Sequence, residues 1–355
     1  MDSVKLRSMK RSGIFKLLLA IGIIVTRGIA NATPIPQDFN KDFVQFIFNG
    51  PSATNLAPMG SGFLVGVKHI RLFMGNVLGI PINPAWATRY FEYYVTAKHV
   101  LQDTNGNVIP EFYLRWSVRT GGVQFVKIDL NDANRWRILT NSDPAVDLAV
   151  IAFAPEPNPT ANWGHSPRPF DVGLPGPYRS AMLDGELIKS KAEFGGSAIR
   201  EGNEMFFIGL FTPFYGSHEN IPICRFGRLA MLSPERIPFE NGKSPQFLYL
   251  METEVFGGNS GSPAFFYSHD ALRVGTLKIG SPSMQLAGIV KGYFGNWSPG
   301  MMIDAKITPL SQQNVGVAAI IPAYQLHEII FSEQEKKIRS DYMKRLVSNA
   351  RRHKK

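Results

Sequence analysis

The stretch Gly257-Gly258-Asn259-Ser260-Gly261-Ser262-Pro263 (GGNSGSP) lies between two runs of apolar and β-branched residues. Two interpretations fit it. Glycine, asparagine, serine and proline are the residues that tight turns between strands select. The same residues suit a loop that holds a nucleophilic serine, because glycine lets backbone N–H groups come close to a substrate. The partners of Ser260 elsewhere in the chain decide between them.

The chain around this loop is rich in short β-type runs that glycine and proline separate. Strands are expected at 43–48, 61–67, 93–97, 111–118, 123–130, 148–153, 204–210, 227–232, 247–253, 262–266, 285–292 and 317–321. A dozen short strands with turn signals between them predict a barrel or a sandwich rather than βαβ units. Two long connections, 68–90 and 155–203, are expected to be surface insertions.

The first 32 residues have the pattern of an export signal, with basic residues before the apolar run 14–25 and an A-x-A cleavage site at Ala30-Asn31-Ala32. The run is shorter than the roughly 20 residues that span a bilayer, and Lys16 interrupts it. We therefore expect a soluble mature chain from Thr33, secreted or periplasmic.

The net charge of +10 is concentrated at the two ends of the chain. Residues 1–32 carry six bases and one acid, and residues 336–355 carry nine bases and one acid, which leaves 23 bases and 26 acids between them. A nucleic-acid-binding domain would have a basic face within the fold, so no nucleic-acid partner is expected. The basic helical tail, 331–355, is either an anionic-surface contact or a solvated terminal helix.

Cys224 is the only cysteine, so the chain can form no intramolecular disulfide. It lies in an apolar run and is expected to pack rather than to react. No H-E-x-x-H motif or cluster of His and Cys ligands is present in the sequence, so neither a metal nor a cofactor is expected.

A serine nucleophile needs a base and an acid that orients the base. His99 is the one histidine at the end of a predicted strand, in VTAKHVL (95–101). Asp147 opens the apolar run DLAVIAF (147–153), where a buried acid has to find a partner, and Asp143 is its rival.

Together, T-A-x-H at 96–99, D-L-A-V at 147–150 and G-N-S-G-S-P at 258–263 resemble the trypsin-like serine peptidases of the chymotrypsin fold. The order His, Asp, Ser and the spacings between them are similar to those of the family. Gly60–Val65, 205–210, 227–231, 286–290 and 317–323 resemble strands of its HtrA/Deg branch. The resemblance covers about residues 43–330, and no PDZ domain is expected after it.

The resemblance implies an all-β fold of two six-stranded antiparallel β-barrels, 33–155 and 204–330, joined by the 155–203 insertion. The active site would lie between the barrels, with a C-terminal helix after them. Ser260 would attack the scissile carbonyl, His99 would carry the proton and Asp147 would orient His99. The backbone N–H groups of Gly258 and Ser260 would form the oxyanion hole.

Asn259 stands where many digestive members have an aspartate that binds a new N-terminus, so no activation beyond signal removal is expected. The resemblance places the substrate pocket at Glu254, Lys291 and Gly292, with a preference for basic residues if Glu254, rather than Glu252, is the acid at its base.

The function expected is an exported serine endopeptidase acting on proteins or peptides. The alternative is a catalytically silent peptide- or protein-binding module on the same fold. An α/β-hydrolase is disfavoured, because its nucleophile motif is G-x-S-x-G and its serine precedes its acid and histidine. The sequence leaves the oligomeric state open.

Overall fold

The structure is a computed structural model that describes residues 41–70, 88–153, 178–179, 181–195, 199–239, 243–268, 283–298, 302–303, 306–307 and 311–352. By its contacts the chain divides into Met1–Phe39 and Asn40–Lys355, and every described residue belongs to the second unit. The predicted export signal at 1–32 therefore lies outside the described residues, as do 71–87 of the first predicted insertion and 155–177, 180 and 196–198 of the second. No helix in the described ranges has the length and apolar character needed to cross a membrane.

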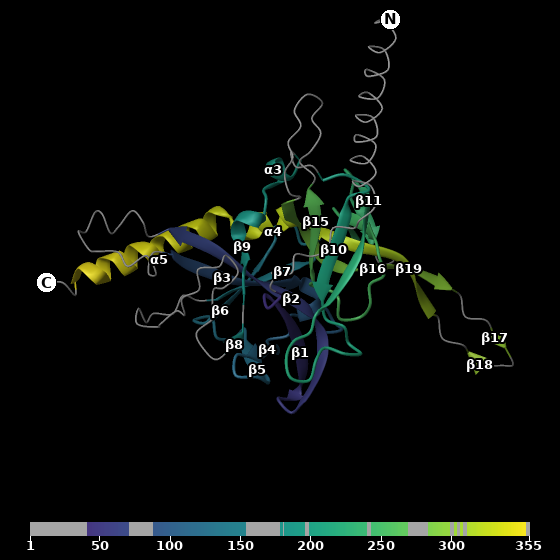
Figure 1. Cartoon of the computed structure of the whole chain (residues 1–355), viewed down its shortest axis with the longest axis horizontal. Coiled ribbons are helices and arrows are strands. Elements are labelled where there is room, and N and C mark those ends of the chain that lie inside the picture. The colour runs from purple at the N-terminus through teal and green to yellow at the C-terminus, as the bar shows by residue number, and fades with distance from the viewer. Residues whose placement is uncertain are drawn as a thin grey trace, which may run out of the picture. The chain divides into compact units, whose positions relative to one another are not determined.

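The first half of the described chain forms a nine-stranded sheet, drawn in colours from purple to teal in Figure 1. Seven strands follow the path β5-β4-β1-β2-β3-β7-β6, while β8 pairs with β4 and β9 pairs with β2. Their bounds are β1 Val44–Ser52, β2 Asn55–Ile70, β3 Thr88–Ala97, β4 Glu111–Val118, β5 Val123–Asp129, β6 Trp136–Thr140, β7 Leu148–Phe153, β8 Tyr178–Arg179 and β9 Leu183–Asp184.

The prediction of a closed six-stranded antiparallel barrel in this half is wrong. The ladder ends at β5 and β6, and within the described part of the chain these two strands do not pair. Most of their side chains are only half-buried, as expected for edge strands that keep one side toward water. The β2–β9 pair is parallel, so the sheet is not purely antiparallel either.

One face of this sheet carries a continuous apolar core. The buried residues of this core are Ile47, Leu64, Tyr94, Ala97, Val100, Leu101, Phe112, Leu114, Trp116, Ile128, Ala149, Ile151 and Met182. Most of them come from strands that alternate inward and outward side chains, which is why apolar residues at every second position meet on one face. Val100 and Leu101 lie in the turn Lys98–Leu101, and Met182 directly precedes β9.

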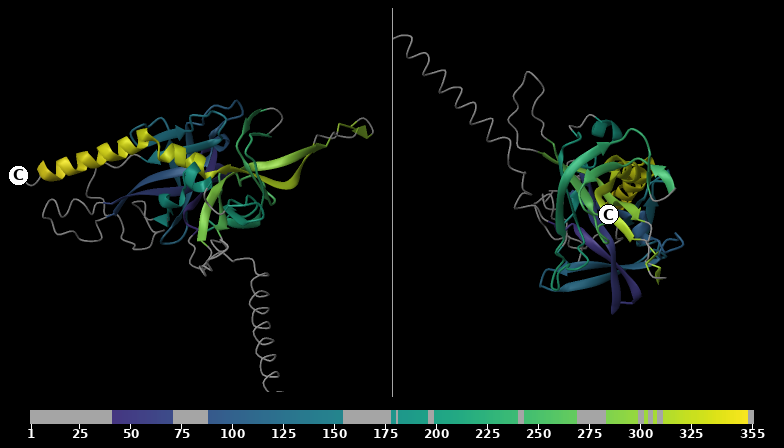
Figure 2. Two further views of the ribbon diagram at one scale, coloured as in Figure 1. Left: turned by 90° about the horizontal axis from the view of Figure 1, so that it is seen from above. Right: turned by 90° about the vertical axis from the view of Figure 1, so that its right-hand side faces the viewer.

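The second half forms the predicted closed six-stranded barrel, in the order β10-β11-β14-β19-β16-β15. The bounds are β10 Glu204–Gly209, β11 Ile223–Leu232, β14 Tyr249–Glu252, β15 Pro263–Ser268, β16 Ser283–Ser298 and β19 Ser311–Pro322. Figure 2 shows the long strands β16 and β19 running side by side. Phe206 and Phe265 stack in the barrel, with ring centroids 5.3 Å apart, and both are fully buried.

Shorter elements complete the described chain. They are the 3₁₀ turns η2 Lys98–Leu101 and η3 Gly185–Leu187, the helices α3 Lys191–Gly195, α4 Ala323–Ile330 and α5 Glu333–Arg352, and the strands β12 Ile237–Phe239, β13 Lys243–Gln246, β17 Met302–Ile303 and β18 Lys306–Ile307. β12 pairs with β13 and β17 with β18.

The C-terminal helix α5 is anchored on the first sheet through a buried acid. Glu335 accepts hydrogen bonds from Arg137 of β6 (2.8 Å) and from the hydroxyl of Tyr93 of β3 (3.1 Å). Arg339, one turn later on α5, donates to the same hydroxyl (2.6 Å). Burial raises the pKa of Tyr93 to about 12, so its hydroxyl keeps its proton and can donate. The start of the predicted basic tail is thus packed against the sheet.

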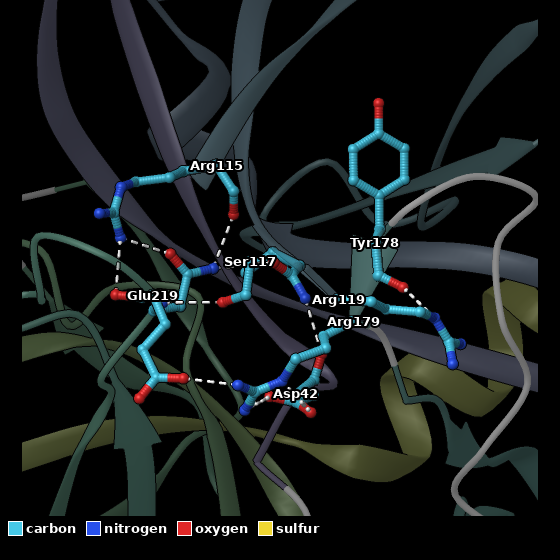
Figure 3. Close-up of polar contacts among 9 residues, drawn as sticks. Asp42, Arg115, Ser117, Arg119, Tyr178, Arg179 and Glu219 are labelled. Atoms are coloured by element: carbon cyan, nitrogen blue, oxygen red, sulfur yellow. Dashed lines mark hydrogen bonds and ion pairs between the residues drawn. The ribbon is translucent and has the colours of Figure 1, made fainter. Parts of the chain in front are cut away.

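A buried arginine fixes the connection between β10 and β11 to the first sheet (Figure 3). Arg115 of β4 donates to the backbone carbonyls of Tyr215, Gly216 and Glu219 and to the side chain of Asn220. Arginine suits this role, because its planar group carries five donors and no acceptor.

Candidate functional site

The paired ends of β3 and β7 bring His99 and Asp147 together. Ala97 at the end of β3 lies opposite Leu148 at the start of β7. Lys98, the residue after β3, begins η2, and Asp147 directly precedes β7. The backbone N–H of Lys98 donates to the carbonyl of Asp147 (3.1 Å). The antiparallel register therefore places the two side chains at the same end of the sheet.

Asp147 accepts two hydrogen bonds from His99. Its Oδ1 accepts the backbone N–H of His99 (2.9 Å), and its Oδ2 lies 2.6 Å from the ring nitrogen Nδ1. The Asp147 side chain is 7% exposed and the His99 ring 43% exposed. Burial works to raise the pKa of Asp147, but the hydrogen bond with His99 and the nearby positive charges outweigh it, so the pKa lies well below the ordinary value. Asp147 is therefore an ionised acceptor that can hold one orientation of the ring.

Two glycines in the left-handed region shape the loop that carries Ser260. Gly258 has φ +95° and Gly261 has φ +86°, a region that residues with a Cβ rarely adopt. At Gly261 an added Cβ would overlap the carbonyl oxygen of Ser61 and the hydroxyl of Thr96. The loop therefore requires glycine for its backbone conformation and for its close approach to β2.

Asn259 holds the same loop from inside. Its side chain is buried, accepting the N–H of Phe256 (2.9 Å) and donating to the carbonyl of Leu210 (2.6 Å). Within the described ranges, the backbone N–H groups of Gly258 and Ser260 donate to no acceptor. The side chain of Asn259 therefore fixes the loop, while these two N–H groups have no acceptor among the described residues.

Ser260 and Asp147 are linked through one residue of β16, Lys291. The hydroxyl of Ser260 donates to the backbone carbonyl of Lys291 (2.8 Å), and the Lys291 ammonium lies 2.6 Å from Oδ2 of Asp147. No hydrogen bond joins Ser260 to His99 in the part of the chain that the structure describes. The structure thus connects the predicted nucleophile, base and acid, with Lys291 between the first and the last of them.

The resemblance predicts Lys291 as a pocket residue, and the structure shows a contact with Asp147 that the resemblance does not predict. A lysine inside the apolar run LAGIVKG (286–292) is the only signal in the sequence that could have indicated a buried partner of opposite charge.

The other predicted site residues lie apart from this cluster or make other contacts. Glu254 is 66% exposed and lies 3.8 Å from Arg225, and Gly292 pairs with Ala319 next to a bulge of β16. The preference for basic residues stays a prediction. Asp143, the rival acid, pairs with Arg236 at 2.6 Å and not with His99.

Cys224 is partly buried on β11, opposite Ile208 of β10. Burial raises the pKa of its thiol, which disfavours the reactive thiolate. Among the described residues, no group of three or more His, Cys, Asp and Glu side chains is arranged to hold a metal ion.

Comparisons with known proteins add a structural match of limited closeness. No family model and no curated protein matches the chain. One solved structure that it is similar to is described as an HtrA-type protease, AlgW, with a tripeptide, at 14% sequence identity and a TM-score of 0.37. The match covers 82% of this chain and 60% of that one, so this chain spans less than two thirds of the length of that protease.

Proposed function

We propose that the chain is a serine endopeptidase in which Ser260, His99 and Asp147 act as nucleophile, base and orienting acid. The observation that carries the proposal is the 2.6 Å contact between Nδ1 of His99 and a buried, ionised Asp147. A carboxylate in that position fixes the tautomer in which Nε2 is free to accept a proton, and it stabilises the charged ring.

The nucleophile loop supplies the second support. Its N–H groups at Gly258 and Ser260 have no acceptor among the described residues, so they are available to a carbonyl oxygen that becomes negatively charged. Removal of one such donor typically costs a few kcal/mol of transition-state stabilisation.

The reaction begins when the Ser260 hydroxyl leaves the carbonyl of Lys291 and turns toward Nε2 of His99. The serine oxygen then attacks the peptide carbonyl while His99 takes the proton, and His99 returns this proton to the leaving amine. Water hydrolyses the resulting ester in a second round, with His99 again as the base.

The closed barrel and the open curled sheet suit a divergent member of the chymotrypsin fold. The export signal proposed at 1–32 would place the enzyme in a secreted or periplasmic location. Contact of the basic tail, 331–355, with an anionic surface is also a proposal.

A catalytically silent peptide- or protein-binding module is the second candidate. The observation that favours it is the resting hydrogen bond of Ser260, which points its proton at Lys291 and not at His99. If Ser260 could not leave this bond, the groups would bind a peptide without cleaving it.

A fluorophosphonate probe separates the two candidates, because it forms a covalent bond only with an activated serine. We expect labelling of the native chain and none of Ser260→Ala. The matched control is Ser262→Ala, two residues away. The Ser262 hydroxyl is fully buried and has no hydrogen-bond partner among the described residues, so its loss should leave labelling intact. Absence of labelling in the native chain, with the fold intact, would favour the silent module.

A further inference from the structure

Lys291 is a buried cation beside the proposed catalytic acid. Its side chain is 7% exposed, and its ammonium lies 2.6 Å from Oδ2 of Asp147 and 4.8 Å from the centre of the Phe239 ring. A lysine is rarely buried unless a partner compensates the loss of hydration. Asp147 supplies the opposite charge, and the face of an aromatic ring adds a favourable contact.

The same carboxylate oxygen serves two donors. Oδ2 of Asp147 is 2.6 Å both from Nδ1 of His99 and from the Lys291 ammonium, while Oδ1 accepts the His99 backbone N–H. Part of the negative charge that would stabilise a protonated His99 is therefore already balanced by the Lys291 ammonium.

A cation near a histidine disfavours its protonated form, and a carboxylate favours it. Near His99 both effects act through one atom, because Lys291 and His99 bind the same carboxylate oxygen, Oδ2 of Asp147. As His99 gains a proton during catalysis, the site would hold two positive charges against one carboxylate.

From this geometry we infer that Lys291 is a positioning residue that restrains the protonation of His99 through Asp147, and so extends the acidic end of the pH range in which His99 acts as a base. This rests on the proposed function of Ser260, His99 and Asp147. The side chain of Lys291 acts on the base, while its backbone carbonyl holds the resting nucleophile.

Other charged groups near this cluster have contacts of their own. The Lys98 ammonium donates to the carbonyl of Pro144 (2.8 Å), and Asp143 is paired with Arg236 (2.6 Å). These groups are the same in every variant below, so they do not account for a difference between variants.

The test compares three substitutions, all of which keep the backbone carbonyl that Ser260 uses. Lys291→Met removes the charge and the hydrogen bond, Lys291→Gln removes the charge but retains a donor, and Lys291→Arg retains both. The first readout is the pH of half-titration of the His99 ring by nuclear magnetic resonance, which requires no activity. The second is the pH of half-maximal fluorophosphonate labelling on the acidic side.

We expect Lys291→Met and Lys291→Gln to move both midpoints upward by about one pH unit, the lower end of the shift that a neighbouring charge causes. Lys291→Arg should keep them near those of the native chain. A merely structural role would lower stability without moving the midpoints, so unchanged midpoints in the Gln variant, or an Arg variant that behaves like Met, would overturn the inference. If the Met variant does not fold, the Gln and Arg pair decides.

The two readouts separate this inference from the proposed function. A shifted His99 titration in a chain whose Ser260 is never labelled would support the role of the Lys291 charge and count against the peptidase. Labelling with unchanged midpoints would support the peptidase and remove the inference.

Discussion

The hydroxyl of Ser61 donates a 2.8 Å hydrogen bond to the carbonyl of Gly258. Ser61 lies on β2 of the open sheet, and Gly258 lies in the loop that carries Ser260, 197 residues further along the chain. The same hydroxyl accepts the N–H of Leu210, and the N–H of Ser61 donates to the carbonyl of Ser260. One serine therefore ties the nucleophile loop to the sheet that holds His99 and Asp147.

Ser61→Ala should destabilise the fold by about 1–3 kcal/mol, because it leaves a buried carbonyl and a buried N–H without a partner. Denaturant unfolding measures this loss. Fluorophosphonate labelling should slow as well, since the loop loses an anchor. Ser52→Ala is the control, because the Ser52 hydroxyl is exposed and, within the described part of the chain, bonds only to the hydroxyl of Thr54. Equal unfolding free energies for the two variants would contradict the role assigned to Ser61.

Gly261→Ala should cost about 2–5 kcal/mol, a sum of backbone strain at φ +86° and overlap with the carbonyl of Ser61. Gly106→Ala is the matched control, because Gly106 has φ +82° but nothing within 4 Å of the added Cβ. Gly106→Ala should lower the free energy of unfolding only by the backbone strain, about 1 kcal/mol. Denaturant unfolding of both variants measures these two losses. If Gly106→Ala lowers the free energy of unfolding as much as Gly261→Ala does, packing against β2 is not the cause of the loss at Gly261.

Arg115→Met should destabilise the chain by about 3 kcal/mol or more, because it leaves three carbonyls of the β10–β11 connection without their donor. Limited proteolysis should then cut near Gly216. Arg119→Met tests the specificity of the effect. Among the residues that the structure describes, the Arg119 side chain makes one exposed hydrogen bond, to the carbonyl of Tyr178, so its loss should change stability by less than about 0.5 kcal/mol (Figure 3).

The contribution of Asp147 to stability should disappear in acid. Its pKa is lower in the folded chain than in the unfolded chain, so its contribution is complete above the unfolded value of about 4 and is lost as pH falls toward the folded value. The unfolding free energy of the native chain should exceed that of Asp147→Asn at pH 7, and the difference should narrow below about pH 4. A difference that stays constant down to pH 2 would contradict the lowered pKa.

Local sequence pattern predicted those strands whose ends carry turn residues. β4 runs over the expected residues 111–118, because Pro110 precedes it and Gly121-Gly122 follow. β6 was missed, since no glycine or proline bounds Trp136–Thr140 and its side chains are half-buried. The two-residue strands β8 and β9 exist only through pairing with distant strands, which no local pattern records.

The lengths of β16 and β19 were underestimated for a related reason. Each extends beyond its apolar run, to Ser298 and from Ser311, because the two strands pair with each other through bulges near Gly292 and Gly295. Whether the first sheet closes into a barrel likewise depends on whether its two edge strands, β5 and β6, pair with each other. The order of strands along the sequence does not determine this.

For the site, the motifs indicated His99, Asp147 and Ser260, and the structure places His99 on Asp147. The contact between Lys291 and Asp147 joins residues 144 apart and depends on how β16 packs against β3, the strand that pairs with β7. Sequence spacing cannot show which of two donors a carboxylate oxygen will bind. In the structure, Oδ2 of Asp147 binds both His99 and Lys291.

Cleavage of a peptide library by residues 33–355, beside the Ser260→Ala variant, tests the central claim most directly. The account predicts hydrolysis of peptide bonds by the native chain and no detectable hydrolysis by the variant. Absence of cleavage by the folded native chain, or equal cleavage by both proteins, would contradict a peptidase that uses Ser260.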